Sequence, residues 1–248
     1  MTTTTAITWR ELSFEASDRQ VYAPRPASLL LAAKAVERVR PGERFLDACT
    51  GSGVVGIAVA RYVAGAEVSV ADVNPSALEA AHRNADANGV AIQVIFSDLY
   101  KAFPNDGFDV ISVHPPAVPY PPGATWGLSE GMTLATDGGS DGSELVIRSI
   151  VEARSHLRPG GRLLLLLPHW SNVALARRTL EEHYVQVQEL ARLEVEFFPA
   201  RDGVVDEPLL EHVRQLASNG TIEMTFETEV PLSVVSVIEA TRPLEPQG

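Results

Sequence analysis

Cysteine is almost absent from this 248-residue chain, which contains only Cys49. A single thiol excludes an internal disulfide and a metal site built from several cysteines. Long apolar runs are also missing, because the most apolar segment, 163–167, is far shorter than the ~20 residues of a membrane-spanning helix and predicts a buried strand. The first five residues, Met-Thr-Thr-Thr-Thr, lack the basic start and apolar core of a signal peptide. We therefore expect a cytoplasmic protein without a membrane segment.

Positive charge is scarce, since 20 Lys and Arg residues stand against 32 Asp and Glu residues and give a formal net charge of −12. Proteins that bind nucleic acids usually carry a basic surface, because contacts to phosphates supply much of their affinity. The charge balance therefore disfavours a nucleic-acid partner. The remaining composition, with 45% hydrophobic and 21% charged residues, is typical of a soluble globular protein of one domain.

Segments with helical and strand periodicity alternate from residue 27 onward. The pattern predicts helices at 27–39, 54–63, 75–88, 143–157 and 172–184, and strands at 44–47, 67–71, 91–96, 108–113, 162–168, 185–198 and 232–240. This alternation indicates an α/β fold with a mostly parallel sheet and helices on both faces.

Two segments stand outside the alternation. Residues 1–20 are polar and mixed, and we expect an N-terminal arm, either loose or a short edge element, before a single domain over 21–248. A helical pattern at 208–217 lies between the last two strands, in an inserted segment at about 203–225. This insertion is a surface helix, a lid or a contact in a homodimer, and the sequence leaves these alternatives open.

A glycine-rich loop follows the first predicted strand, in the sequence Phe-Leu-Asp-Ala-Cys-Thr-Gly-Ser-Gly-Val-Val-Gly at 45–56. Gly51, Gly53 and Gly56 match the dinucleotide-binding pattern G-x-G-x-x-G, and Asp72 follows about 20 residues later, as that pattern requires. The strand, loop and helix order predicts a cofactor that contains a nucleotide. An NAD-dependent oxidoreductase is therefore one interpretation.

Two acids favour S-adenosylmethionine instead. A carboxylate at Asp47 repels a pyrophosphate, which prefers backbone amides and a helix N-terminus, but it suits a ligand with an ammonium and a sulfonium group. Asp98 follows the third strand and can accept a hydrogen bond from an adenine amino group, while Asp72 holds the ribose. Each acid alone is explained equally well as a cap of a helix or turn. Together they follow three successive strands, at the sheet edge where open α/β folds bind ligands.

Four segments resemble the class I S-adenosylmethionine-dependent methyltransferases, and more specifically the HemK-like glutamine amide N-methyltransferases. They are Tyr-Ala-Pro-Arg-Pro at 22–26, the loop at 47–53, His114-Pro115-Pro116 in place of the family's Asn-Pro-Pro-Tyr, and the segment 134–142 with Gly-Gly-Ser-Asp-Gly in place of Gly-Gly-x-Asp-Gly. The resemblance implies a Rossmann-like sheet of seven strands whose last strand is antiparallel. It also implies N-methylation with S-adenosylmethionine as the cofactor.

The residues and the resemblance together predict three sets of site residues and no metal ligand. The cofactor-binding set is Arg25, Asp47, Cys49, Thr50, Gly51, Gly53, Asp72, Val73, Asn74, Asp98, Leu99 and His114. The catalytic set is His114, Pro115 and Tyr120. The substrate-binding set is Tyr22, Pro116, Tyr120, Trp126 and His169.

The chain departs from the family pattern at His114, which replaces the asparagine, and at Ala117, which replaces the tyrosine. In the family motif, the asparagine and a proline carbonyl accept hydrogen bonds from a planar NH2 group. A histidine can orient a nitrogen or hydroxyl group, act as a general base, or make a merely structural hydrogen bond.

This altered motif, the acidic charge and the short segment before Pro24 favour a small-molecule acceptor. Methylation of a protein glutamine, as in a release factor, is the alternative. A module that binds the cofactor without turnover is a third interpretation.

Overall fold

The structure is a computed structural model, and it describes residues 4–17, 20–105, 107–123, 128–197, 200–201, 204–228 and 230–244. The strands are β1 (Thr4–Trp9), β2 (Leu12–Ser17), β3 (Arg44–Ala48), β4 (Glu67–Asp72), β5 (Gln93–Phe96), β6 (Phe108–Val113), β7 (Leu157–Pro168), β8 (Gln186–Glu196), β9 (Ala200–Arg201), β10 (Val204–Val205), β11 (Met224–Thr225) and β12 (Leu232–Thr241). The helices are α1 (Pro26–Arg38), α2 (Val54–Tyr62), α3 (Pro75–Ala87), α4 (Glu130–Thr136), α5 (Glu144–His156), α6 (Val173–His183) and α7 (Glu207–Ser218).

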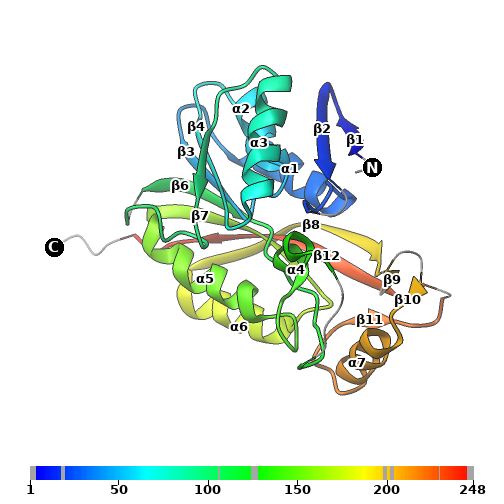
Figure 1. Ribbon diagram of the computed structural model, residues 1–248. Helices are drawn as coiled ribbons and strands as arrows, with labels where there is room; N and C mark the ends of the chain where they lie inside the picture. Colours follow the sequence, from blue (N-terminus) through cyan, green and yellow to red (C-terminus); the bar gives the residue numbers. More distant parts are fainter. Residues whose placement is uncertain are drawn as a thin grey trace.

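An eight-stranded sheet forms the centre of the molecule, with helices on both faces (Figure 1). The strand order is β11-β12-β7-β6-β3-β4-β5, and β8 also pairs with β12. The strands β3 to β7 are mutually parallel, while β12 is antiparallel to both β7 and β8. The predicted α/β class, the mostly parallel sheet and the antiparallel last strand are therefore confirmed, and the two-residue β11 is added to the seven predicted strands.

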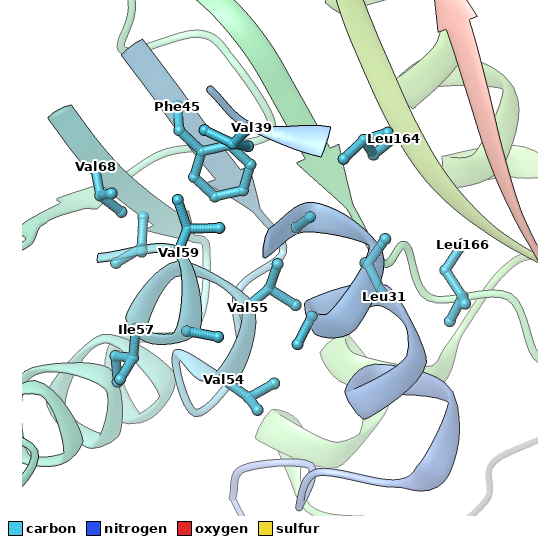
Figure 2. Close-up of a cluster of buried hydrophobic side chains, with 14 of the residues drawn as sticks. Leu31, Val39, Phe45, Val54, Val55, Ile57, Val59, Val68, Leu164 and Leu166 are labelled. Atoms are coloured by element: carbon cyan, nitrogen blue, oxygen red, sulfur yellow. The ribbon is translucent and has the colours of Figure 1, made fainter. Parts of the chain in front are cut away.

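The apolar strand residues divide between two cores because successive side chains of a strand point to opposite faces. In β7, Leu164 and Leu166 pack into the cluster that α1, α2 and α3 cover, which Figure 2 shows around Phe45 and Leu31. Leu165 packs with Leu163 and Leu167 into the second cluster, which α5 and α6 cover. Burial on both faces explains why the sequence of β7 is continuously apolar.

Helix α2 lies unusually close to β4 at Gly56, where a Cβ atom would stand 2.3 Å from Cγ1 of Val70. We expect Gly56→Ala to lower the free energy of unfolding by about 1–3 kcal/mol, because the added methyl overpacks this contact. Urea denaturation of the two proteins measures the difference. An unchanged midpoint and slope would show that α2 shifts away from β4 without cost.

An N-terminal hairpin of β1 and β2 packs beside α3 (Figure 1). Leu12 and Phe14 are buried, with exposures of 2% and 0%. The side-chain amides of Asn84 in α3 and of Asn88 directly after α3 both donate to and accept from the backbone of β2, at 2.8–3.0 Å. The two asparagines therefore pair with the hairpin as a neighbouring strand would, and they fix β2 against α3.

Helix α7 follows β8 and precedes β12 in the sequence, and it lies to one side of the main sheet, near β11 (Figure 1). Asp206 caps its N-terminus by accepting a hydrogen bond from the backbone N–H of Leu209 at 3.0 Å. Its apolar residues form a separate cluster with Phe197, against which Tyr120 and Trp170 pack. The inserted helix therefore supports residues that follow β6 and β7.

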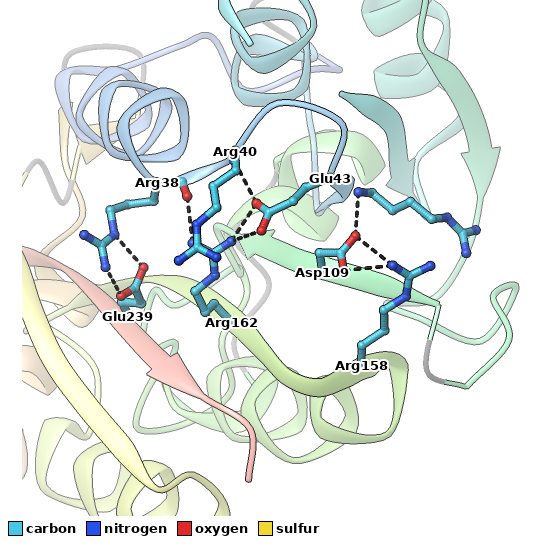
Figure 3. Close-up of polar contacts among 8 residues, drawn as sticks. Arg38, Arg40, Glu43, Asp109, Arg158, Arg162 and Glu239 are labelled. Carbon is cyan, nitrogen blue, oxygen red and sulfur yellow. Dashed lines mark hydrogen bonds and ion pairs between the residues drawn. The ribbon is translucent and has the colours of Figure 1, made fainter. Parts of the chain in front are cut away.

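Ion pairs lie at one end of the sheet, where the parallel strands begin (Figure 3). Arg162 donates to both carboxylate oxygens of Glu43 at 2.6 Å, and Arg158 binds Asp109 at 2.9 Å. These pairs join β6, β7 and the segment before β3 far from the carboxyl ends of the strands. In the described part of the chain, no helix is long and apolar enough to cross a membrane.

Candidate active site

A cavity opens at the carboxyl ends of the parallel strands. Residues that follow five strands line it, namely Cys49 after β3, Asp72 at the end of β4, Asp98 after β5, His114 after β6 and Trp170 after β7. The strand order reverses between β3 and β6, which is the switch point where open α/β sheets bind ligands. Part of the segment before α1 and the last turn of α4 complete the walls.

Asp47 lies at the base of this cavity with only 1% of its surface exposed. Its carboxylate accepts hydrogen bonds from the hydroxyls of Thr50 and Ser112, both at 2.6 Å, and from the backbone N–H of Gly56 at 3.3 Å. Burial raises the pKa of Asp47 to about 6, and the hydrogen bonds oppose this shift. The acid therefore ties β3 to β6 and to the start of α2, and it fixes the shape of the glycine-rich loop.

Asp72 shapes the same loop from the neighbouring strand. Its two carboxylate oxygens accept the backbone N–H groups of Gly51 and Asn74, both at 2.9 Å. Burial raises the pKa of this carboxyl group above its usual value, although the backbone hydrogen bonds oppose the shift. A carboxylate at the cavity wall with unused lone pairs suits the hydroxyl groups of a ribose. Cys49 lines the cavity together with these two acids, and burial raises the pKa of its thiol.

Asp98 is held by two cations outside the cavity. The guanidinium of Arg148 in α5 donates to both carboxylate oxygens at 3.1 Å, and the ammonium of Lys101 donates to one of them at 2.5 Å. The hydrogen bond from Lys101 and the contacts with Arg148 lower the pKa of Asp98, so the group is a fixed anion. Its remaining lone pair faces no described donor and suits the amino group of an adenine.

We expect Arg148→Met to weaken binding of S-adenosylhomocysteine about tenfold, because a charge-assisted hydrogen bond that orients Asp98 is lost. S-inosylhomocysteine, which lacks the adenine amino group, is expected to lose much less affinity. Isothermal titration of both analogues measures the effect, with Arg154→Met on the exposed side of the same helix as a control. Equal losses for the two analogues would contradict this role for Asp98 and Arg148.

His114 follows β6 and begins the Pro-Pro segment on the cavity wall. Burial lowers the pKa of His114 to about 4, so the imidazole is neutral near pH 7. Its Nδ1 atom lies 3.5 Å from the Oγ atom of Ser28 in α1. No described residue makes a hydrogen bond with its Nε2 atom, which leaves this nitrogen for a ligand.

The backbone after His114 is packed against the Gly-Gly-Ser-Asp-Gly segment. A Cβ atom on Gly138 would stand 2.5 Å from Cα of Ala117, and one on Gly142 would stand 2.4 Å from the carbonyl oxygen of the same residue. Gly138 also donates its N–H to the carbonyl of Val118 at 3.0 Å. The glycines of this segment therefore allow the close backbone contact that holds the Pro-Pro segment in place.

The cavity brings together most of the residues predicted from the sequence. Those that line it are Tyr22, Asp47, Cys49, Thr50, Gly51, Asp72, Val73, Asn74, Asp98, Leu99, His114, Pro115 and Pro116. Their donors, acceptors and apolar surfaces fit S-adenosylmethionine: Asp72 would accept hydrogen bonds from a ribose, Asp98 would accept one from an adenine, and Val73 and Leu99 would supply apolar contacts.

Four predicted residues lie outside this lining. Arg25 is exposed and stacks over Tyr22, and Gly53 lies at the start of α2. The hydroxyl of Tyr120 bonds with Thr136 at 3.1 Å, while the buried ring of His169 bonds with Glu223 at 2.6 Å and Ser236 at 2.9 Å. Trp126 lies outside the described residues. The four described residues therefore remain predictions without a place in the cavity lining, and Trp126 remains a prediction that the structure does not address.

Several lining residues were missed by the sequence analysis, among them Ser28, Trp170 and the α4 residues Leu134, Ala135 and Thr136. Helix α4 was not predicted, because it is short and because the glycines in its segment are typical of a loop. Trp170 follows the predicted His169 directly. The turn after β7 places Trp170 in the cavity lining, whereas the ring of His169 bonds with Glu223 and Ser236. Among the described residues, no group of three or more His, Cys, Asp and Glu is arranged to hold a metal ion.

Comparisons of the chain with known proteins agree on one family. Residues 25–119 match the model of the methyltransferase small domain. The chain is 32% identical over 178 residues to a putative protein N5-glutamine methyltransferase of Methanocaldococcus jannaschii, and the match covers 72% of this chain and 87% of that protein. It is 37% identical over 165 residues to the release factor glutamine methyltransferase of Gloeobacter violaceus, which covers 63% of this chain and 57% of that protein.

Other matches extend this picture. The ribosomal protein uL3 glutamine methyltransferase of Bradyrhizobium diazoefficiens is 35% identical over 135 residues, or 49% of this chain and 40% of that protein. Among solved structures, the 16S rRNA N2 G1207 methyltransferase of T. thermophilus has a TM-score of 0.59 at 19% identity, covering 97% of this chain and 50% of that one. This last likeness concerns the fold alone.

The sheet order is that of the class I methyltransferase fold, and the glycine-rich loop and the three acids lie at the carboxyl edge of this sheet. The chain belongs to the family of the HemK-like protein glutamine methyltransferases. This membership confirms the predicted enzyme class and cofactor, and it removes the NAD-dependent alternative. The chain spans 57% of the relative from Gloeobacter violaceus and 40% of the one from Bradyrhizobium diazoefficiens.

The preference for a small-molecule acceptor over a protein was wrong. The relatives are named for methylation of a release factor or of ribosomal protein uL3, and both of these acceptors are proteins. The preference depended partly on the net charge of −12. A net charge sums over the whole surface and does not describe the cavity, so it could not separate the two kinds of acceptor.

Proposed function

We propose that this protein transfers the methyl group of S-adenosylmethionine to the side-chain amide nitrogen of a glutamine in a protein. The observation that carries the proposal is the position of His114-Pro115-Pro116 on the wall of the cofactor cavity, with the Nε2 atom of His114 free of described partners. The names of the relatives support a protein glutamine as the acceptor.

An amide NH2 group needs two hydrogen-bond acceptors to hold its plane in the cavity. The neutral imidazole of His114 supplies one of them through a ring nitrogen. The carbonyl of Pro115 supplies the other, since it accepts no hydrogen bond from a described residue. Both acceptors are attached to a buried Pro-Pro segment, so little conformational freedom is lost when the acceptor binds.

His114 orients the amide and does not serve as its base. A general base works best with a pKa near the working pH, and burial lowers the pKa of His114 to about 4. In the reaction, the amide nitrogen forms a bond to the methyl carbon while the bond between that carbon and sulfur breaks. The nitrogen then loses a proton, which becomes strongly acidic once the new bond forms and passes to water. Positioning is therefore the main contribution of the protein.

The low pKa of His114 predicts a specific pH dependence. The imidazole is uncharged above about pH 5, so kcat is expected to show no His114 titration between about pH 6 and 8. As the pH falls through about 4, the ring takes up a proton and loses its acceptor, and activity should fall where the protein is still folded. Rates across this range in wild-type and His114→Asn enzymes test the assignment. An inflection near pH 6.5 that disappears in His114→Asn would contradict it.

Methyl transfer to purified proteins tests the proposed function. The enzyme is incubated with methyl-labelled S-adenosylmethionine and with a release factor or ribosomal protein uL3 from the same organism. We expect label in at least one of these proteins, and we expect acid hydrolysis to release it as methylamine, as an N-methylated side-chain amide does. Label that stays on an amino acid after hydrolysis would overturn the amide assignment. Transfer to neither protein, with transfer to small metabolites, would overturn the protein acceptor.

A further inference from the structure

His114 has one described side-chain partner, and it comes from a distant part of the chain. The Oγ atom of Ser28 lies 3.5 Å from Nδ1 of His114, across a sequence separation of 86 residues. Ser28 belongs to the first turn of α1, is 6% exposed, and lines the same cavity. Its oxygen also accepts the backbone N–H of Arg25 at 3.4 Å. The entry segment of α1 therefore fixes the hydroxyl beside the ring.

The proton position on a neutral imidazole decides what the ring offers to a ligand. One ring nitrogen is a donor and the other is an acceptor, and the hydrogen bond made by one nitrogen determines the role of the other. An asparagine needs no such selection, because its carbonyl oxygen always accepts. A chain with His114 in this position therefore needs a group that selects the tautomer.

We propose that Ser28 is a positioning residue that selects the tautomer of His114. Its oxygen accepts the Nδ1–H group, so the lone pair of Nε2 faces the acceptor amide. The inference rests on the proposed function for the identity of the amide, but the tautomer itself is a property of the protein without an acceptor. The opposite arrangement, in which the Ser28 hydroxyl donates to Nδ1, makes Nε2 a donor and cannot bind an NH2 group.

Nitrogen NMR of the histidine rings tests the tautomer directly. The protein is labelled with ¹⁵N-histidine and saturated with S-adenosylhomocysteine, and the His114 signals are assigned by their absence in His114→Asn. We expect a protonated Nδ1 and an unprotonated Nε2 in the wild type and in Ser28→Thr, which keeps the hydroxyl. In Ser28→Ala we expect a shift toward protonated Nε2. Protonated Nε2 in the wild type, or spectra that are unchanged in Ser28→Ala, would overturn the proposal.

A double-mutant cycle gives the second readout. Ser28→Ala is expected to lower kcat about tenfold in the wild-type background, which corresponds to the loss of one hydrogen bond. In the His114→Asn background the same change should have little effect, because asparagine has no tautomer to select. Equal losses in both backgrounds would show that Ser28 has only a structural role. The NMR experiment needs no methyl-accepting substrate. An unexpected tautomer would therefore overturn the role of Ser28 without bearing on the proposed function.

Discussion

His114→Ala is expected to lower kcat by about 10²-fold or more, because the substitution removes the acceptor that orients the amide nitrogen. Binding of S-adenosylhomocysteine should change little, since we expect the cofactor contacts to come mainly from the glycine-rich loop and from Asp72 and Asp98, which line the cavity. His114→Asn should keep much of the activity, because its carbonyl oxygen offers the same kind of acceptor. Steady-state methyl transfer and isothermal titration measure the two effects separately.

The matched control for this experiment is His82→Ala. His82 is exposed on α3, and its partner Asp86 is exposed as well. Its removal should leave both turnover and cofactor binding unchanged. If His114→Ala turns over at the wild-type rate with a confirmed acceptor, the orienting role of the imidazole is wrong. If His114→Ala instead loses cofactor binding, the residue belongs to the cofactor site alone.

Gly138→Ala is expected to abolish most of the activity, although Gly138 itself does not line the cavity. The new Cβ would lie 2.5 Å from Cα of Ala117 and 2.7 Å from its carbonyl carbon, and neither backbone atom belongs to a flexible side chain that can move aside. The Pro-Pro segment must therefore shift, and a small displacement of a positioning group costs about 10²-fold in rate. Overpacking should also lower the free energy of unfolding by about 1–3 kcal/mol. Turnover and urea denaturation of the variant check both effects.

Ser140→Ala serves as the control for Gly138→Ala, since Ser140 is exposed in the same segment. It should leave turnover and unfolding close to those of the wild type. A Gly138→Ala enzyme with normal turnover would show that the close backbone contact does not hold the Pro-Pro segment. A loss of stability with normal turnover would limit the contact to a structural role.

The sequence predicted the sheet and its functional edge well, because both depend on local patterns. Period-two alternation and apolar runs identify the strands, and an acid at the end of β3, β4 and β5 lies at one edge as soon as the strands are parallel. The hairpin of β1 and β2 was predicted only as a loose arm or a short edge element, although Leu12 and Phe14 alternate with polar residues. The small number of apolar residues in this segment hid a strand that is buried on one face only.

The partners of the site residues could not be predicted in the same way. Asp47 and Ser112, like Asp98 and Arg148, are brought together by the packing of separate elements, and no local pattern links them. The sequence offered Asp47 as a ligand for positive charge, whereas the structure shows its oxygens occupied by three protein donors. The register between β3 and β6 brings Ser112 to Asp47, whereas Thr50 and Gly56 come from the loop and helix that directly follow β3.

The conformation of the loop after β6 could not be predicted from the sequence, and this limited the prediction of the substrate-binding residues. Tyr120 follows the Pro-Pro segment closely in sequence, but its backbone N–H bonds to the carbonyl of Gly139 at 3.1 Å and its ring joins the α7 cluster. Thr136, which accepts or donates the bond with the Tyr120 hydroxyl, lines the cavity in its place. Proximity in sequence after a strand therefore predicts the edge of the sheet correctly and the direction of a loop side chain poorly.

Mapping the methylated residue by tandem mass spectrometry tests the central claim most directly. A release factor and ribosomal protein uL3 are treated with the enzyme and S-adenosylmethionine, with the His114→Ala enzyme as the control. The account predicts one added methyl group on the side-chain amide of a glutamine, present with the wild-type enzyme and nearly absent with the variant. A methyl group on any other residue type, or unmodified proteins under conditions where the enzyme consumes S-adenosylmethionine, would contradict it.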